Sequence, residues 1–162
     1  MELTSTKIKS LNSLKGIVKS LKKEEKTIVL TNGAFDLLHY GHIVYLKKAK
    51  GLGDVLIVAI NSDFSVKKLK GEKRPIMNEK ERSLLVASLN VVDYVVVFEE
   101  ETVRNILKEL KPHFHVKGPD YTVETVAESK FSDSLGIKTI IVGEKKEHST
   151  TDIIKKIEGL YG

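Results

Sequence analysis

Residues 54–60 read Asp-Val-Leu-Ile-Val-Ala-Ile, so an uninterrupted apolar run follows Asp54. A short apolar run rich in β-branched residues is typical of a strand that is buried on both faces. Such strands belong mainly to parallel sheets, because crossover helices cover each side of the sheet. The run therefore predicts an α/β protein built on a mostly parallel sheet.

Strand-like and helix-like segments alternate along the rest of the chain. Strands are expected at residues 27–30, 54–60, 93–98, 113–116 and 137–142, and helices at 13–24, 43–49, 78–89, 101–110, 122–134 and 149–157. This alternation predicts a doubly wound, Rossmann-like, five-stranded parallel sheet in the order 3-2-1-4-5, with helices on both faces. We expect residues 1–26 to form a helical extension, capped by Asn12 or Ser13, that packs on a domain formed by residues 27–162.

The composition narrows the classes of function. The 162 residues suffice for one domain with a proper core, and the absence of cysteine excludes disulfides and thiol catalysis. No apolar run approaches the roughly 20 residues that span a bilayer, and residues 1–10 lack a signal-peptide pattern. We therefore expect a cytoplasmic protein without a membrane partner. The net charge of +5 comes from scattered lysines, which disfavours nucleic-acid binding.

The segment TNGAFDLLHYGH, residues 31–42, joins the first expected strand to the helix at 43–49. Its glycine-containing turn leaves backbone N–H groups for an anion, and the helix N-terminus adds about half a positive charge. His39 and His42 are three residues apart, with Gly41 between them, so both imidazoles can face one side of the helix entrance. The pattern favours phosphate binding over surface or capping histidines. A zinc site is disfavoured, because neither cysteine nor a carboxylate stands at ligand spacing.

Polar clusters follow three other expected strands: Asn61-Ser62-Asp63, Lys117-Gly118 and Ser149-Thr150-Thr151. In doubly wound sheets ligands bind beyond the carboxyl ends of the strands, so these clusters are expected on one rim with the histidines. The chain lacks a P-loop, a Gly-x-Gly-x-x-Gly fingerprint and a Gly-x-Ser-x-Gly elbow. Phosphate recognition without an evident nucleophile suits direct phosphoryl or nucleotidyl transfer.

His39-Tyr40-Gly41-His42 matches the His-x-Gly-His motif of the cytidylyltransferase-like nucleotidyltransferases, and Ser149-Thr150-Thr151 matches their Ser-Thr-Thr signature. The chain resembles this family from about residue 27 to residue 157. Within the family it is most similar to the heptose 1-phosphate adenylyltransferases. That similarity rests on TNGAFDLLHYGH, NSDFSVKKLKGEKRPI, Glu81-Arg82, Val92-Asp93-Tyr94 and VKGPDYT.

The resemblance implies that a phosphate oxygen of heptose 1-phosphate attacks the α-phosphorus of ATP, giving ADP-heptose and pyrophosphate. Such a product serves lipopolysaccharide-core or other glycan precursor synthesis. ATP would be a substrate accompanied by Mg²⁺, which the phosphates rather than a protein cage would hold. The resemblance also implies a homodimer, and a separate sugar kinase upstream to make the acceptor.

Site residues carried over from the family fall into three groups. His39, His42 and Lys70 would be catalytic, and Lys68 or Lys70 would neutralise phosphate charge from a mobile segment before Pro75. Nucleotide binding would add Asn32, Gly33, Ala34, Phe35, Lys68, Arg82, Lys117, Gly118, Asp120, Ser149, Thr150 and Thr151. Asp36, Asn61 and Asp63 would face the acceptor sugar.

Two departures from the heptose branch leave the nucleotide base open between ATP and CTP. Pro119 stands where that branch often has glycine, and Glu147-His148 precede Ser149 where a glycine-containing pair is common. The alternatives are a glycerol-3-phosphate cytidylyltransferase, an FMN adenylyltransferase and, outside enzymes, a nucleotide-binding regulatory module.

Overall fold

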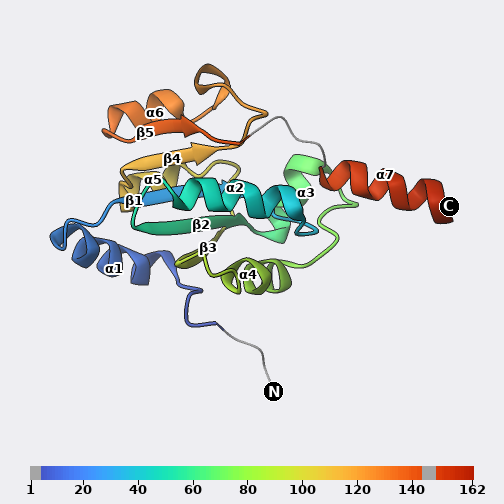
Figure 1. Ribbon diagram of the computed structural model, residues 1–162, viewed down its shortest axis with the longest axis horizontal. Helices are drawn as coiled ribbons and strands as arrows, with labels where there is room; N and C mark the ends of the chain where they lie inside the picture. Colours follow the sequence, from blue (N-terminus) through green and yellow to red (C-terminus); the bar gives the residue numbers. More distant parts are fainter. Residues whose placement is uncertain (1–4, 144–148) are drawn as a thin grey trace.

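The computed structural model describes residues 5–143 and 149–162, and within them five strands form one sheet in the order β3-β2-β1-β4-β5 (Figure 1). Every neighbouring pair of strands is parallel. The strands are β1 (Ile28–Gly33), β2 (Val55–Asn61), β3 (Tyr94–Phe98), β4 (Phe114–Lys117) and β5 (Lys138–Ile141). The helices are α1 (Leu11–Lys23), α2 (Tyr40–Lys50), α3 (Asp63–Lys70), α4 (Glu79–Ala87), α5 (Arg104–Leu110), the 3₁₀ turn η1 (Val123–Thr125), α6 (Ser129–Ser134) and α7 (Thr150–Tyr161).

The strand order and the parallel sheet confirm the fold predicted from the sequence. All seven residues of β2 are buried, as its apolar run predicted. The chain winds from β1 through β2 to β3 and then returns to place β4 on the other side of β1. This reversal puts the topological switch point between β1 and β4, where open α/β sheets bind their ligands.

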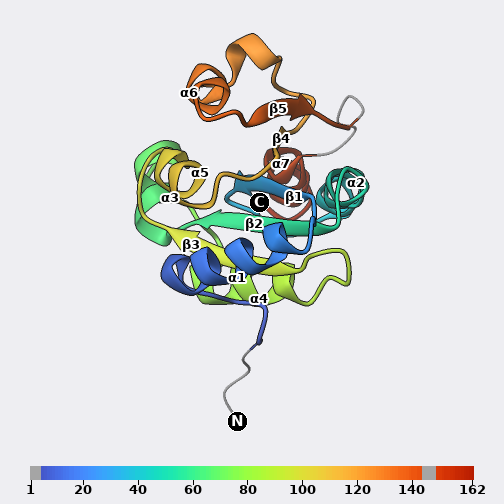
Figure 2. The same cartoon turned by 90° about the vertical axis from the view of Figure 1, so that its left-hand side faces the viewer.

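Two apolar cores lie on the two faces of the sheet, and Figure 2 shows α5 and α2 on opposite sides of it. One core contains Leu14 and Val18 of α1 with Ile106 and Leu107 of α5. The other contains Leu46 and Ala49 of α2 with residues of α4. Among the described residues no helix is long and apolar enough to cross a membrane.

The N-terminal helix begins earlier than the sequence predicted. Ser10 is the N-cap, because its Oγ accepts a hydrogen bond of 3.1 Å from the backbone N–H of Ser13. The expected caps, Asn12 and Ser13, lie inside α1 and were wrong. Ahead of the helix, Ile8 pairs with Val95 of β3 in a parallel bridge. The N-terminal segment therefore covers part of the edge of the sheet.

The lysine-rich segment before Pro75, which the resemblance predicts to be mobile, contains α3 at residues 63–70. Ser62 caps this helix, since its Oγ accepts from the N–H of Ser65 at 3.1 Å. Asp63 lies in the first turn, where a negative charge favours the helix dipole. Residues 122–134 do not form one helix, because η1 and α6 are separated by Val126 in extended conformation. Capping boxes formed by Asn78 with Glu81 and by Ser149 with Asp152 begin α4 and α7, close to where helices were expected.

Candidate active site

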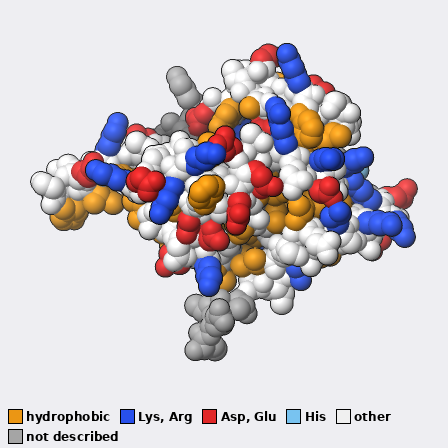
Figure 3. All heavy atoms as spheres, turned by 180° about the vertical axis from the view of Figure 1, so that it is seen from behind, with side chains coloured by type: hydrophobic (Ala, Val, Ile, Leu, Met, Phe, Trp, Pro, Cys, Tyr) orange, Lys and Arg blue, Asp and Glu red, His pale blue; other side chains and the backbone are white. Residues whose placement is uncertain are grey.

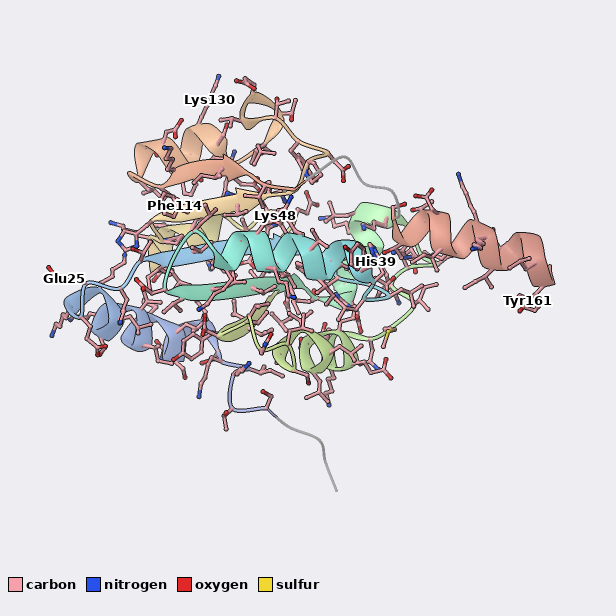
Figure 4. The ribbon with its side chains drawn as sticks, viewed as in Figure 1. Glu25, His39, Lys48, Phe114, Lys130 and Tyr161 are labelled. Carbon is pink, nitrogen blue, oxygen red and sulfur yellow. The ribbon has the colours of Figure 1, made fainter. Side chains whose placement is uncertain are left out.

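A cavity of about 840 Å³ lies beyond the carboxyl ends of β1, β2 and β4 and beside the N-terminus of α2. Its size falls in the range of small-molecule sites, roughly 300–1,000 Å³. His39 lies at the end of α2 that faces the start of α7 (Figure 4). The predicted site residues that line the cavity are Asn32, Gly33, Ala34, Phe35, Asp36, His39, His42, Asn61, Lys70, Lys117, Gly118, Asp120 and Thr150.

Five predicted site residues do not line this cavity: Asp63, Lys68, Arg82, Ser149 and Thr151. Lys68 forms an ion pair with Glu101, on the segment after β3. Ser149 caps α7, and Thr151 is an exposed residue in the first turn of that helix. Asp63 and Arg82 form an ion pair with each other.

The two histidines form a hydrogen-bonded cap at the start of α2. Nδ1 of His39 accepts from the N–H of Gly41 at 3.1 Å, and Nδ1 of His42 accepts from the N–H of His39 at 3.2 Å. Their ring centroids lie 3.9 Å apart. Because each Nδ1 accepts a hydrogen bond, each neutral ring carries its proton on Nε2. The cap thus turns both histidines into Nε2–H donors at a helix end that already favours anions.

The loop between β1 and α2 holds a strained conformation. Phe35 and Leu37 have φ values of 50° and 51°, in the left-handed region that side chains rarely adopt. Such residues cost of order 1–3 kcal/mol each and persist where their surroundings fix them. The fully buried Arg82 fixes the loop from below, donating to the carbonyl oxygen of Ala34 at 2.6 Å and to Oδ1 of Asp63 at 2.8 Å.

Asp36 fixes the same loop from its other side. Its carboxylate accepts from Nε of Arg74 at 2.8 Å and from the N–H groups of Ile76 and Met77 at 2.9 and 3.0 Å. Burial opposes ionisation of this carboxyl, but the two backbone donors and Arg74 outweigh it and hold its pKa below the ordinary value. Thr150, at the start of α7, donates to the carbonyl oxygen of Asp36 at 2.8 Å. The side chain of Asp36 therefore binds the segment after α3.

His115, a residue that the sequence reasoning missed, lies under the cleft. Its Nε2 is 2.9 Å from Oδ1 of Asn32, and Nζ of Lys117 donates to the same oxygen at 3.5 Å. Burial, with a smaller effect from the charge of Lys117, lowers the pKa of His115 to about 3. Its Nδ1 has no hydrogen-bond partner among the described residues. The neutral ring therefore carries its proton on Nε2 and donates it to Asn32. Its place within the expected strand at residues 113–116 was the only feature of the sequence that could have indicated a buried histidine here.

Tyr45 ties α2 to the switch point, and the sequence reasoning missed it too. Its hydroxyl binds the Thr31 hydroxyl of β1 and donates to the carbonyl oxygen of Val116 in β4 at 2.9 Å. Burial of this hydroxyl raises the pKa of Tyr45. The tyrosine therefore stays neutral at physiological pH and holds α2 against the two strands that flank the reversal.

The wall formed by residues 117–121 contacts the end of β5. Gly143 has a φ of +108°, and a Cβ there would lie 3.0 Å from Cδ of Pro119. A larger residue at position 143 would thus be strained and would crowd the proline. The second departure from the heptose branch, Glu147-His148, lies outside the described residues.

Residues 30–156 match the family model described as cytidylyltransferase-like. The chain belongs to this family. The predicted family is confirmed, and with it the enzyme class of nucleotidyltransferase. Among the described residues no group of three or more His, Cys, Asp or Glu side chains could hold a metal ion.

Curated relatives of this nucleotidyltransferase include two proteins named bifunctional protein HldE. The one from Geobacter metallireducens is 48% identical over 98% of this chain and 32% of its own length. The one from Helicobacter pylori strain G27 is 50% identical over 90% of this chain and 30% of its own length. The chain thus spans about a third of the curated relatives that it matches.

Solved structures show the same fold. A lipopolysaccharide core biosynthesis protein from Thermoplasma volcanium GSS1 is 32% identical with a TM-score of 0.65, covering 75% of this chain and 99% of that one. Pantoate-beta-alanine ligase from Francisella tularensis, in a complex with β,γ-ATP and β-alanine, has a TM-score of 0.62. Its identity is only 19%, over 95% of this chain and 77% of that one, so it supports the fold alone.

Proposed function

We propose that this nucleotidyltransferase joins AMP from ATP to a heptose 1-phosphate, giving ADP-heptose and pyrophosphate for lipopolysaccharide-core or other glycan precursor synthesis. The similarity to proteins named HldE, and to a lipopolysaccharide core biosynthesis protein at 32% identity, supports this substrate class. The single observation that carries the chemistry is the histidine cap. It places two Nε2–H donors at a helix N-terminus beside the switch point of the sheet.

The proposed reaction is an in-line displacement without a covalent enzyme intermediate. A phosphate oxygen of the acceptor attacks the α-phosphorus of ATP, and the bond from that phosphorus to the oxygen bridging the α- and β-phosphates breaks. Pyrophosphate leaves with the bonding electrons. His39 and His42 donate to phosphate oxygens as negative charge grows there, and the start of α2 adds its partial positive charge. Lys70, which lines the cavity, supplies a further positive charge.

The other cavity residues have proposed roles in nucleotide binding. Asn32, Gly33, Ala34 and Phe35 line the floor at the end of β1, and Lys117, Gly118 and Asp120 line the wall proposed to hold base and ribose. Thr150 joins the start of α7 to the loop through Asp36. Mg²⁺ would arrive with the triphosphate, because phosphate oxygens supply the hard ligands that this ion prefers.

The proposal also covers the oligomeric state, the upstream enzyme and the location of the protein. A homodimer is supported by exposed apolar side chains of α7, namely Ile157, Leu160 and Tyr161. Figure 3 shows hydrophobic side chains mixed with charged ones on the surface seen from behind. Light scattering after size exclusion measures the oligomeric state. A sugar kinase would act upstream to make the acceptor, and a cytoplasmic location would supply ATP to both enzymes.

A pyrophosphate-release assay tests the substrate pair. Purified protein is supplied with ATP and heptose 1-phosphate, with CTP and glycerol 3-phosphate, and with ATP and FMN. We expect the first pair to give the highest kcat/KM, by ~10⁴-fold, because a site built for hydroxyls leaves polar groups unpaired with the wrong acceptor. Mass spectrometry of the product confirms ADP-heptose. A higher kcat/KM for either rival pair would overturn the heptose proposal. If no pair released pyrophosphate, the proposed catalytic activity would be wrong.

A further inference from the structure

Both carboxylates expected to face the acceptor sugar are already engaged. Asp36 binds Arg74 and two backbone N–H groups, and Asp63 binds the buried Arg82. Asn61 donates its amide N–H to Oγ of Ser65 at 3.0 Å. A polyhydroxylated acceptor needs hydrogen-bond acceptors for its hydroxyl groups, so other side chains of the cleft must supply them.

The cavity has a second part whose chemistry differs from that of the histidine end. The segment after β3 contributes Glu101 and Thr102, and the segment from η1 to α6 contributes Thr125 and Glu128. Carboxylates repel phosphate oxygens and accept hydrogen bonds from hydroxyl groups. Phosphates therefore favour the histidine end, and the hydroxylated part of a ligand favours the other.

Glu128 is the hydrogen-bond acceptor in this second part of the cavity that a ligand could use. It is only 7% exposed, although it lines the cavity. No hydrogen bond or ion pair to its carboxylate is found among the residues that the structure describes. Glu101, by contrast, is held by Lys68. The carboxylate oxygens of Glu128 are not among the buried side-chain atoms that lack a hydrogen-bond partner, so they keep access to the solvent of the cavity, where hydroxyl groups of a ligand can donate to them.

We infer that Glu128 is a specificity-determining residue that accepts hydrogen bonds from hydroxyl groups of the acceptor, in the cavity that Thr102 also lines. This inference rests on the proposed transfer to a polyhydroxylated phosphate. It orients the acceptor, with its phosphate toward His39 and His42 and its hydroxyl groups toward Glu128. An acceptor without hydroxyl groups on that side leaves the carboxylate unpaired, which is how the site rejects it.

Two substitutions separate this role from a structural one. Glu128→Ala removes the carboxylate, and Glu128→Gln keeps the shape but replaces an acceptor oxygen by an amide donor. Glu124→Ala is the matched control, because Glu124 is an exposed glutamate on η1 outside the cavity lining. Pyrophosphate release gives KM for acceptor and for ATP, and thermal unfolding gives Tm.

We expect Glu128→Ala to raise KM for the acceptor by at least about 10-fold, because the variant loses hydrogen bonds from acceptor hydroxyl groups to a charged carboxylate. KM for ATP should stay within about 2-fold, Glu128→Gln should fall in between, and the control should match wild type. Tm of Glu128→Gln should stay close to wild type, because the variant keeps the packing of a residue that is only 7% exposed, whereas Glu128→Ala loses that packing and should lower Tm modestly. An unchanged acceptor KM, an equal rise in both KM values, or a large drop in Tm of Glu128→Gln would each overturn the inference.

The substrate panel keeps this inference distinct from the proposed function. If wild type turns over glycerol 3-phosphate rather than heptose 1-phosphate, the heptose proposal fails. The variants are then measured with glycerol 3-phosphate, which also carries hydroxyl groups. A rise in its KM on loss of Glu128 would support the subsite, and an unchanged KM would overturn it.

Discussion

Nε2 of His115 donates to Oδ1 of Asn32 across 2.9 Å, which fixes the orientation of the Asn32 amide at the floor of the cleft. Lys117 donates to the same oxygen, so both neighbours select the oxygen side of the amide. The amide nitrogen of Asn32 is then directed away from these donors. His115 thus positions a cleft residue from beneath it, through the strand neighbouring β1.

The first prediction concerns this positioning. His115→Leu removes the donor and lets the Asn32 amide turn over, so kcat/KM should fall about 10-fold, the equivalent of one neutral hydrogen bond. His115→Gln retains an N–H donor and should recover part of the loss. Because the pKa of His115 is lowered to about 3, the ring is neutral throughout pH 5–9. The pH–rate profile of His115→Leu should therefore keep the wild-type shape at a lower level, and a changed shape would contradict the neutral ring.

Substitutions of His42 can distinguish its role in catalysis from its role in capping α2. His42→Asn keeps an acceptor near the position of Nδ1 for the N–H of His39 but has no counterpart of Nε2–H. We expect kcat to fall by about 10²-fold or more, since a donor to transition-state charge is typically worth ~3 kcal/mol. Tm should change little, whereas His42→Ala should also lose about 1 kcal/mol of capping.

A control histidine lies away from the cleft. Nδ1 of His113 accepts from the N–H of Ile28 at 2.9 Å, at the start of β1. His113→Ala should lower Tm and leave kcat unchanged. If His42→Asn and His113→Ala behaved alike, with lower Tm and normal kcat, the histidines would be structural residues only.

We predict that Arg82 contributes to the stability of the folded protein. Arg82→Met removes the donors to Ala34, Met77 and Asp63, and because the Asp63 side chain is 35% exposed, we expect a loss of about 2 kcal/mol rather than the full cost of a stranded buried charge. Urea unfolding measures this loss. Arg104→Met is the control, because Arg104 is exposed and its guanidinium lies 5.5 Å from the ring centroid of Phe131, a contact worth about 1 kcal/mol or less. Equal losses of unfolding free energy in the two variants would mean that the contacts of Arg82 with Ala34 and Asp63 do not stabilise the fold.

Local patterns in the sequence predicted what depends on near neighbours. The apolar run of β2 and the spacing of the two histidines act within a few residues, and the strand and the start of α2 formed as expected. The partners of Asp36, Asp63 and Arg82 could not be predicted in the same way. Asp36 meets Arg74 from 38 residues away, and Arg82 meets Ala34 from 48. Such pairs depend on which side chains the loops bury together, which no periodicity records.

The pH dependence of stability should report on Asp36. Its pKa is lower in the folded protein than in the unfolded chain, so the folded state gains stability from its ionised form. That gain is fully present above the ordinary carboxyl pKa of about 3.9 and is lost as pH falls from there through the folded pKa. Asp36→Asn keeps the shape but cannot ionise, so it should be less stable than wild type at pH 7. Urea unfolding from pH 7 down to pH 2.5 should show the two free energies of unfolding converging only below about pH 4. A constant difference across that range would mean that the interactions of Asp36 with Arg74, Ile76 and Met77 do not depend on its charge.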